Sequence, residues 1–257
     1  MDWSLLDKQR LPRSYRKLAG DAYDDCLAYL DEQIGALFDE LERRGALERT
    51  LVIITSDHGE GLGEHDLFMH GESLYRPETR VPLLILPPSR RPSGAVVRQP
   101  VSLRDLPATI LDLISLRAGS PFPGRSLARH WADRPVGPPP AGGNVVLSEL
   151  KAPNPSDPNQ GRSPSHRGPM LALAEGDYIY IRNEGDGREE LFHRRDDPHE
   201  LRDLAGAEAM RPVLRRFRDA ASRAGAPAGA PAAGRRVASG PGAGRAARGP
   251  DGSEALR

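Results

Sequence analysis

The chain has 257 residues, a formal net charge of zero at pH 7, one cysteine, 27 glycines and 25 prolines. A single cysteine excludes an internal disulfide, the balanced charge gives no overall attraction to nucleic acid, and no apolar run approaches the roughly 20 residues that span a bilayer. The length allows one domain with extensions, and the first residues are too polar for a secretory signal, which leaves the cellular location unknown.

Residues 14–44 predict one long amphipathic helix. Its apolar side chains recur at steps of three and four residues, which places them on one face of a helix: Leu27, Leu30, Ile34, Leu37, Phe38 and Leu41. Gly45 follows this pattern and is a typical helix terminator. We expect the apolar face to pack against a sheet.

The apolar run from Leu51 to Ile54 predicts a strand that is covered on both faces in an α/β sheet. Asp57 and His58 stand just past the carboxyl end of this strand. Open α/β sheets bind ligands at that edge, because loops there aim side chains without breaking the strand pairing. A second apolar run at residues 83–86 predicts another buried strand.

Three histidines, His58, His65 and His70, and four acidic residues lie within the fourteen residues 57–70. The glycines between them permit the sharp bends that bring these side chains together. A carboxylate oxygen from Asp57 and an imidazole nitrogen from His58 suit a divalent cation that keeps a position for substrate. The loop therefore predicts half of a hydrolase metal site.

The carboxyl-terminal part predicts a small antiparallel sheet with a helix packed across it. Alternating apolar runs separated by turn residues give the strands, which we place at residues 144–150, 170–174, 178–182 and 189–192, with the helix at about 208–221. Two connectors rich in proline and glycine, residues 134–143 and 151–169, flank the first of these strands. Residues 222–257, rich in Ala, Gly, Pro and Arg, predict a disordered tail.

Several spaced motifs carry a family resemblance. They are SDHGE at 56–60, GEH at 63–65, HG at 70–71, SLY at 73–75 and RVPL at 80–83, with DLPAT at 105–109, GRSL at 124–127, ELF at 190–192 and DPHE at 197–200. Their order resembles the carboxyl-terminal half of an arylsulfatase-like sulfatase of the alkaline-phosphatase superfamily. The resemblance implies an α/β fold with a partial central sheet flanked by helices, plus a small C-terminal antiparallel sheet.

The resemblance also implies residue roles. Asp57 and His58 match two ligands of a catalytic divalent cation, with calcium favoured and manganese or zinc as alternatives. His70 matches the position that places a donor against the sulfate or the leaving-group oxygen, which makes it the candidate catalytic residue. His65 is a candidate for substrate binding or for supporting the ligands, and a surface histidine is the equally weighted alternative.

The nucleophile motif of the family, Cys or Ser followed by x-Pro-x-Arg, has no match in the 257 residues. Cys26 lies in a helical pattern without the proline or the arginine, and Ser156 and Ser239 lack the arginine. We therefore expect a chain that is inactive alone: a fragment, a product of a misplaced start codon, or a degenerate remnant. The expected division is residues 1–132 as half of the catalytic domain, 133–221 as a small subdomain, and 222–257 as the tail.

Three functions fit the sequence. The favoured one is metal-dependent hydrolysis of a sulfuric ester, with a small-molecule or glycan sulfate ester as substrate. The second is a phosphodiesterase, phosphonate hydrolase or phosphoethanolamine transferase of the same superfamily, and the third is an inactive remnant or binding module. Neither a nucleic acid nor a membrane is an expected partner, and the oligomeric state is unknown.

Overall fold

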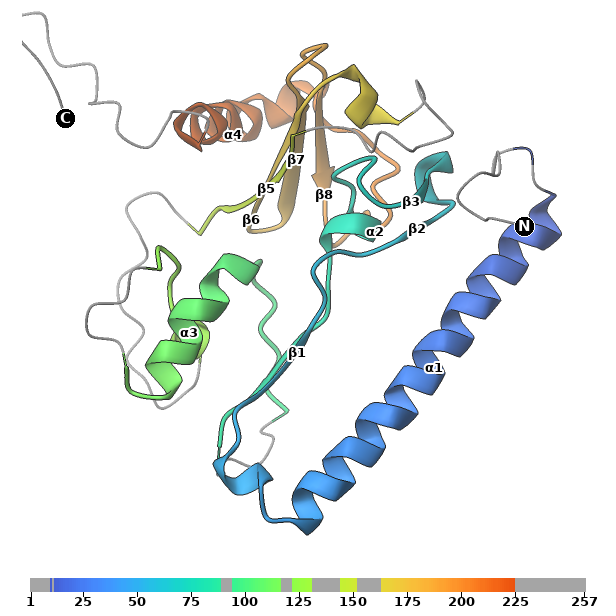
Figure 1. The fold of residues 1–257 in the computed structure, drawn as a ribbon. Coiled ribbons are helices and arrows are strands. Elements are labelled where there is room, and N and C mark those ends of the chain that lie inside the picture. Colours follow the sequence, from blue (N-terminus) through green and yellow to red (C-terminus); the bar gives the residue numbers. More distant parts are fainter. Residues whose placement is uncertain are drawn as a thin grey trace, which may run out of the picture. The chain divides into compact units, whose positions relative to one another are not determined.

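The computed structural model describes residues 10, 12–88, 94–116, 122–130, 144–151 and 163–224. The chain divides into two compact units, Met1–Gly225 and Ala226–Arg257, and every described residue lies in the first unit (Figure 1). The predicted connector at 134–143, most of the connector at 151–169 and nearly all of the predicted tail lie outside the described residues. The division at residue 132 stays a prediction.

Helix α1 spans Arg13–Arg43 and confirms the predicted helix. Gly45, at a φ of 63°, ends it, with the backbone N–H groups of Gly45 and Ala46 donating to the carbonyls of Glu42 and Leu41. This pattern is a Schellman motif, which satisfies the last carbonyls of a helix. The expected packing of the apolar face is not found within the described residues, because Leu27, Leu30 and Leu37 are about half exposed, at 47%, 51% and 55%.

Strands β1 (Val52–Thr55) and β4 (Leu83–Leu86) form an antiparallel pair with Val52 opposite Leu86 and Thr55 opposite Leu83. They make a two-stranded sheet. The predictions that the first strand is covered on both faces and that the second is buried are wrong for the described residues, since neither strand has a buried residue and Leu84 is 51% exposed. Each strand is bonded to the other, and no further strand extends the pair within the described ranges.

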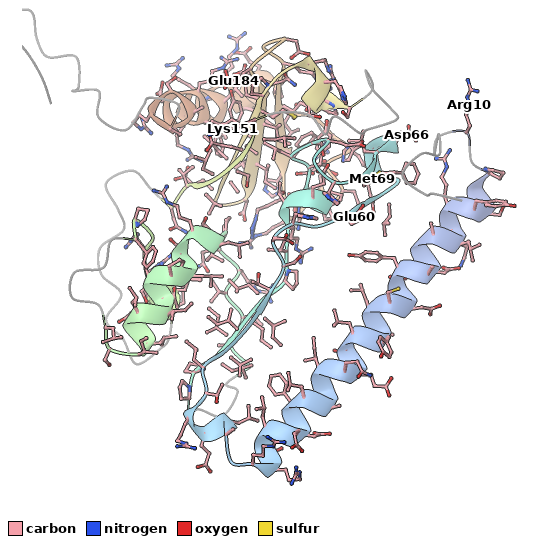
Figure 2. The ribbon with its side chains drawn as sticks, viewed as in Figure 1. Arg10, Glu60, Asp66, Met69, Lys151 and Glu184 are labelled. Carbon is pink, nitrogen blue, oxygen red and sulfur yellow. The ribbon has the colours of Figure 1, made fainter. Side chains whose placement is uncertain are left out.

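A short hairpin carries the loop of histidines. Its strands are β2 (Gly61–Leu62) and β3 (Phe68–Met69), which pair antiparallel. Gly63, at a φ of 120°, begins the turn, and its N–H donates to the Leu67 carbonyl at 2.9 Å. Figure 2 labels Glu60 just before this hairpin and Asp66 and Met69 on it. The hairpin reverses the chain, so that residue 70 returns toward residue 60.

Two helices follow the hairpin, α2 (Arg76–Thr79) and α3 (Leu106–Leu113). Helix α3 begins directly after Asp105, within the DLPAT motif. The turn at residues 124–127 packs against it, because Asp105 accepts a hydrogen bond from the Arg125 N–H at 2.8 Å and Thr109 accepts one from the Leu127 N–H at 2.8 Å. Short 3-10 helices complete this part of the chain and the rest: Leu47–Arg49, Glu64–Asp66, Leu103–Asp105, Leu127–His130, Pro164–Arg167 and Glu208–Met210.

The carboxyl-terminal sheet confirms the small antiparallel sheet. Its strands follow the order β5-β6-β7-β8, with bounds within two residues of the predicted ones: Val146–Leu150, Met170–Glu175, Tyr178–Asn183 and Glu189–His193. Gly176, at a φ of 58°, lies in the turn between β6 and β7. Helix α4 (Arg211–Ala224) lies along one face of this sheet (Figure 1).

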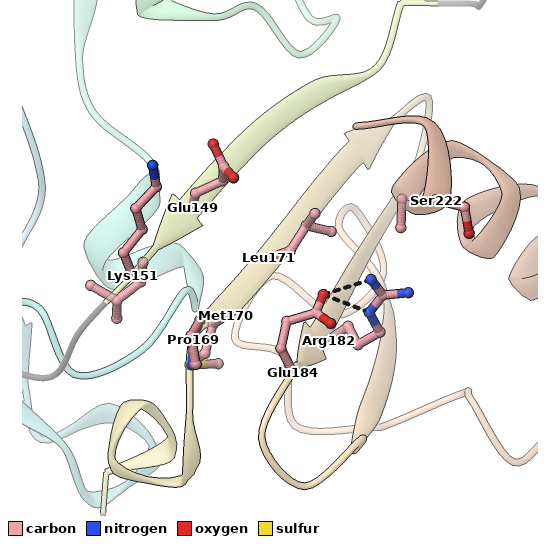
Figure 3. Close-up of a pocket in the computed structure, with 10 residues that line it drawn as sticks. Glu149, Lys151, Pro169, Met170, Leu171, Arg182, Glu184 and Ser222 are labelled. Carbon is pink, nitrogen blue, oxygen red and sulfur yellow. Dashed lines mark hydrogen bonds and ion pairs between the residues drawn. The ribbon is translucent and has the colours of Figure 1, made fainter. Parts of the chain in front are cut away.

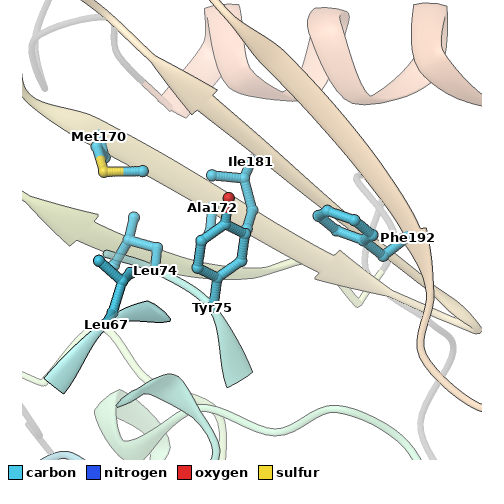
Figure 4. Packing of buried hydrophobic residues seen from close by; sticks show 7 residues of the cluster. All are labelled: Leu67, Leu74, Tyr75, Met170, Ala172, Ile181 and Phe192. Carbon is cyan, nitrogen blue, oxygen red and sulfur yellow. The ribbon is translucent and has the colours of Figure 1, made fainter. Parts of the chain in front are cut away.

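Each face of the four-stranded sheet carries an apolar cluster. On one face, α4 contributes Leu214, Phe217 and Ala221, which pack on residues from β6, β7 and β8. On the other face, Leu67, Leu74 and Tyr75 pack on the sheet (Figure 4). They belong to residues 61–75, which we call the hairpin segment. The sheet side chains on this face are Met170, Ala172, Ile181 and Phe192. Full burial of one such side chain stabilises a fold by about 1.5–3 kcal/mol. The sheet therefore holds the segment that carries His70.

None of the helices within the described residues is long and apolar enough to cross a membrane.

Candidate metal centre

The first arm of the candidate site is residues 57–60, directly after β1. The Asp57 carboxylate accepts a hydrogen bond from the His58 backbone N–H at 3.0 Å, and its second oxygen lies 3.7 Å from His58 Nε2. The hydrogen bond from the His58 backbone, together with the charge of the His58 ring, lowers the pKa of the Asp57 carboxyl. The Asp57 side chain is 87% exposed, so an ionised carboxylate is open to an incoming cation.

The His58 ring has one nitrogen committed to the backbone. Nδ1 lies 2.9 Å from the Gly59 carbonyl oxygen. A carbonyl only accepts hydrogen bonds, so in the neutral ring Nδ1 carries the proton and Nε2 keeps its lone pair. This is the tautomer in which Nε2 binds a metal.

The second arm is His70, which follows β3. The β2–β3 hairpin returns the chain so that the rings of His58 and His70 stack, with centroids 4.0 Å apart and planes 29° from parallel. The expectation that the His70 ring folds back toward the ligand pair therefore agrees with the geometry.

Glu60, one of the four acidic residues of the loop, joins the two arms. Its Oε2 lies 2.8 Å from His70 Nδ1, and both side chains are partly exposed. A carboxylate at this distance from Nδ1 orients the ring. The sequence gives no signal for this pair, because the two residues are ten positions apart and meet only after the hairpin forms.

These residues fit a divalent cation. Ligand atoms of His58, Glu60 and His70 all lie within 4.8 Å of one another, which is the convergence that one ion requires. Asp57 stands beside His58 and adds a carboxylate with no competing cation partner among the ion pairs that involve described residues. Asp57 lies outside the convergent group of His58, Glu60 and His70. The two imidazoles and one carboxylate of that group suit a transition metal such as zinc or manganese more than calcium, which prefers oxygen.

His65 lies on the other side of the hairpin. Its ring stacks on Tyr75, with centroids 3.9 Å apart and planes 8° from parallel, and it is not in the cluster of His58, Glu60 and His70. Burial lowers the pKa of His65, and its Nε2 is buried without a hydrogen-bond partner. The ring is therefore half-buried against Tyr75, with its Nε2 shielded from solvent.

A shallow pocket lies elsewhere. It has a volume of about 400 Å³ and is lined by residues of β5, β6, β7 and α4, including Glu149, Lys151, Arg182 and Ser222 (Figure 3). Arg182 is bonded there to Glu184 at 2.5 Å. No residue of the candidate centre lines this pocket, and its opposed charges give it no clear preference for an ion.

Comparisons with known proteins agree with these features. Residues 7–116 match the family model described as Sulfatase. Among curated proteins, the choline-sulfatase of Rhizobium meliloti is 31% identical over 188 residues, which cover 72% of this chain and 32% of that protein. Arylsulfatase K of Danio rerio is 32% identical over 185 residues, which cover 69% of this chain and 32% of the relative.

Solved structures share the fold. A 2-O GAG sulfatase superposes with a TM-score of 0.62 at 21% identity, covering 76% of this chain and 40% of the other. A phosphonate monoester hydrolase from Silicibacter pomeroyi gives a TM-score of 0.58 at 26% identity, covering 76% of this chain and 38% of the other. The chain thus spans about a third of the length of the curated relatives that it matches.

Proposed function

We propose that this chain, which belongs to the sulfatase family, supplies the cation-binding and leaving-group half of a site that hydrolyses sulfuric esters. The observation that carries the proposal is the convergence of His58, Glu60 and His70 on one small volume beside Asp57. The family match across residues 7–116 includes all four of these residues. The proposal therefore assigns Asp57 and His58 to a divalent cation, with Glu60 and His70 beside them.

The proposed roles come from the family resemblance, and the positions of the side chains support them. Asp57 and His58 are the proposed ligands of a divalent cation, which when bound neutralises charge on the sulfuryl oxygens. His70 is the proposed proton donor to the leaving-group oxygen, and the Glu60 carboxylate at 2.8 Å keeps the ring oriented. His65 supports the hairpin by stacking on Tyr75, so its proposed role is to hold the ligand loop and not to touch substrate.

The cation and the substrate class are part of the proposal. Calcium is the ion that the family resemblance favours, whereas the imidazole of His58 favours manganese or zinc. The proposed substrate is a sulfate ester of a small molecule or a glycan. Support comes from the relatives, since one is described as a choline-sulfatase and one structural neighbour as a GAG sulfatase.

A second candidate is hydrolysis of a phosphonate monoester or phosphodiester. The structural neighbour from Silicibacter pomeroyi, at 26% identity, is described as a phosphonate monoester hydrolase, and the Asp57–His58 pair suits that chemistry as well. Both reactions develop negative charge on a departing oxygen and use the same kind of electrostatic stabilisation. An inactive remnant is the third candidate, because no nucleophile motif occurs in residues 1–257.

A pair of assays distinguishes the three candidates. The purified chain is tested with nitrophenyl sulfate and bis-nitrophenyl phosphate in the presence of calcium, manganese or zinc. We expect no useful turnover, because loss of a covalent nucleophile removes a group that acts as a unit with the metal and the proton donor. Turnover by the chain alone that is abolished by Asp57→Ala would contradict this expectation and place a nucleophile within these residues.

The second assay uses a chimera that joins the nucleophile-bearing segment of the choline-sulfatase relative ahead of residue 1. Hydrolysis of the sulfate ester, lost in the Asp57→Ala chimera, supports the proposed function. Preferred hydrolysis of the phosphodiester favours the second candidate. A folded chimera that turns over neither substrate supports the inactive remnant.

A further inference from the structure

Glu78 of α2 is bonded to both arms of the metal centre. Its backbone carbonyl accepts from the Gly59 N–H at 2.8 Å, and Gly59 stands between His58 and Glu60. Its carboxylate accepts from the Gly71 N–H at 2.7 Å, next to His70. One residue therefore touches the backbone of the two segments whose side chains must converge.

The carboxylate organises the whole turn after His70. Besides the Gly71 bond, its Oε2 accepts from the Glu72 N–H at 3.2 Å and its Oε1 accepts from the Ser73 hydroxyl at 2.5 Å. Glu78 is buried, with 7% of its surface exposed. A buried carboxylate is costly to desolvate, and three donors to it offset that cost. These bonds fix the direction in which the chain leaves residue 70.

The first arm lies directly on α2. A Cβ added at Gly59 would stand 2.0 Å from the Pro77 carbonyl oxygen, which is far closer than any real carbon contact. The backbone at residue 59 thus approaches the helix as closely as a chain without a side chain can. The hydrogen bond from the Gly59 N–H to the Glu78 carbonyl can form because Gly59 has no Cβ to collide with Pro77.

Helix α2 is in turn held by the carboxyl-terminal part of the chain. The Arg76 N–H, at the start of α2, donates to Glu200 Oε2 at 2.8 Å. The Arg76 guanidinium donates to the carbonyls of Arg194 at 2.7 Å and Pro198 at 3.3 Å. A short helix anchored at this end offers a fixed support for both arms.

We propose that Glu78 is a positioning residue, whose carboxylate holds the proposed proton donor His70 against the proposed cation ligand His58. The inference rests on the proposed function only in giving that contact a purpose. The contact between the two rings can be measured independently of activity. His70 also bonds to Glu60, a member of the candidate ligand group, and removing bonds that support metal ligands typically changes metal affinity about 10–100-fold.

The experiment separates the effect of side-chain length from the effect of side-chain charge at position 78. Glu78→Gln keeps the length of the side chain and an oxygen that accepts from Gly71, whereas Glu78→Asp keeps the charge but draws the carboxylate back by one methylene. Thr79→Ala is the matched control, because the Thr79 hydroxyl bonds to the Tyr75 carbonyl within the same helix and to neither arm. Each variant is checked for folding by thermal unfolding.

The first readout is the NOE between the ring protons of His58 and His70 in the metal-free chain. We expect the NOE to persist in Glu78→Gln and Thr79→Ala and to be lost in Glu78→Asp. An unchanged NOE in a folded Glu78→Asp variant would overturn the proposal, as would an equal loss in Glu78→Gln. If Glu78→Asp does not fold, the NOE of Glu78→Gln decides: its loss overturns the proposal and its persistence supports it.

The second readout is the affinity for Mn²⁺ measured by calorimetry. We expect it to fall about 10–100-fold in Glu78→Asp and to stay near the wild-type value in Glu78→Gln and Thr79→Ala. Equal affinities in wild type and Glu78→Asp would count against the proposal. A wild-type chain that binds no Mn²⁺, Zn²⁺ or Ca²⁺ would contradict the proposed function, while the NOE would still decide the role of Glu78.

Discussion

The Tyr75 hydroxyl donates to the Glu190 carboxylate, at 3.1 Å from Oε1 and 3.0 Å from Oε2, across 115 positions of sequence. Tyr75 belongs to the hairpin segment and Glu190 to β8. Both side chains are buried, at 7% and 6% exposure, and burial together with the Glu190 charge raises the pKa of the tyrosine hydroxyl. This bond connects the hairpin segment, which carries His70, to the carboxyl-terminal sheet.

Tyr75→Phe is expected to lower the free energy of unfolding by about 1.5–3 kcal/mol, because a buried charge loses a hydrogen bond while the ring still packs on Phe192. Urea unfolding measures the change. Tyr29→Phe is the matched control, since Tyr29 is 65% exposed and its loss of a hydroxyl should change the unfolding free energy little. Equal effects of the two substitutions would show that the bond to Glu190 contributes nothing.

Glu200 gives the fold a pH dependence. Burial raises the pKa of its carboxyl to about 7 from a reference of 4.5. Because the folded state binds the Glu200 proton more tightly than the unfolded state, protonation of Glu200 stabilises the fold. This contribution is fully present below pH 4.5 and is lost as pH rises through 7. The total is about 3 kcal/mol, at about 1.4 kcal/mol per unit.

Glu200→Gln should remove this loss of stability between pH 4.5 and pH 7, as measured by unfolding at a series of pH values. Glu208→Gln serves as the control, because Glu208 is exposed and pairs with Arg211 on the surface. A wild-type profile that is flat over this interval would contradict the raised pKa of Glu200, and so would a profile that Glu200→Gln leaves unchanged.

Gly59→Ala is expected to destabilise the fold by about 1–3 kcal/mol, as overpacking does, because the new methyl group would meet the Pro77 carbonyl oxygen at 2.0 Å. Gly20→Ala, in α1, has nothing within 4 Å of its new Cβ and should stabilise the helix by about 0.5–1 kcal/mol. Thermal unfolding of both variants compares them. The two substitutions are predicted to change the stability in opposite directions. A Gly59→Ala variant with unchanged stability would show that residue 59 does not lie against α2.

Cation preference follows from the donor set. Zn²⁺ or Mn²⁺ should raise the unfolding temperature more than Ca²⁺ at equal concentration, because imidazole nitrogen favours the transition metals. A ligand present at 100 times its Kd stabilises a fold by about 2.7 kcal/mol. His58→Ala should abolish the shift, and His166→Ala, which changes a histidine outside the centre, should not. A larger shift with Ca²⁺ would favour the ion that the family resemblance implies.

Elements with a strong local pattern could be predicted from the sequence. The extent of α1 follows from apolar spacing and Gly45, and the strands of the carboxyl-terminal sheet follow from alternation and from turn residues such as Gly176. The apolar run at β1 predicted burial on both faces, and this was wrong for the described residues. An apolar run shows that a strand favours burial. Whether the strand is buried depends on which other parts of the chain pack against it.

The arrangement of the site could be predicted only in part. Asp57, His58 and His70 were identified by residue type and order, because a strand end followed by metal donors is a local signal. The His58–His70 stack and the Glu60–His70 bond depend on a hairpin whose strands have two residues each, too few to show a period. The bonds from Glu78 to Gly59 and Gly71 join segments that approach only in three dimensions, so no spacing rule predicts them.

The most direct test of the metal centre is paramagnetic broadening by Mn²⁺ in the ¹H–¹⁵N spectrum of the chain. The account predicts that the first signals to broaden are those of residues 57–60 and 70–71, and that Asp57→Asn with His58→Ala removes this effect. Broadening that begins instead at the exposed acidic side chains of α1, such as Asp24 and Asp25, and leaves His58 and His70 unaffected would contradict the proposed metal centre.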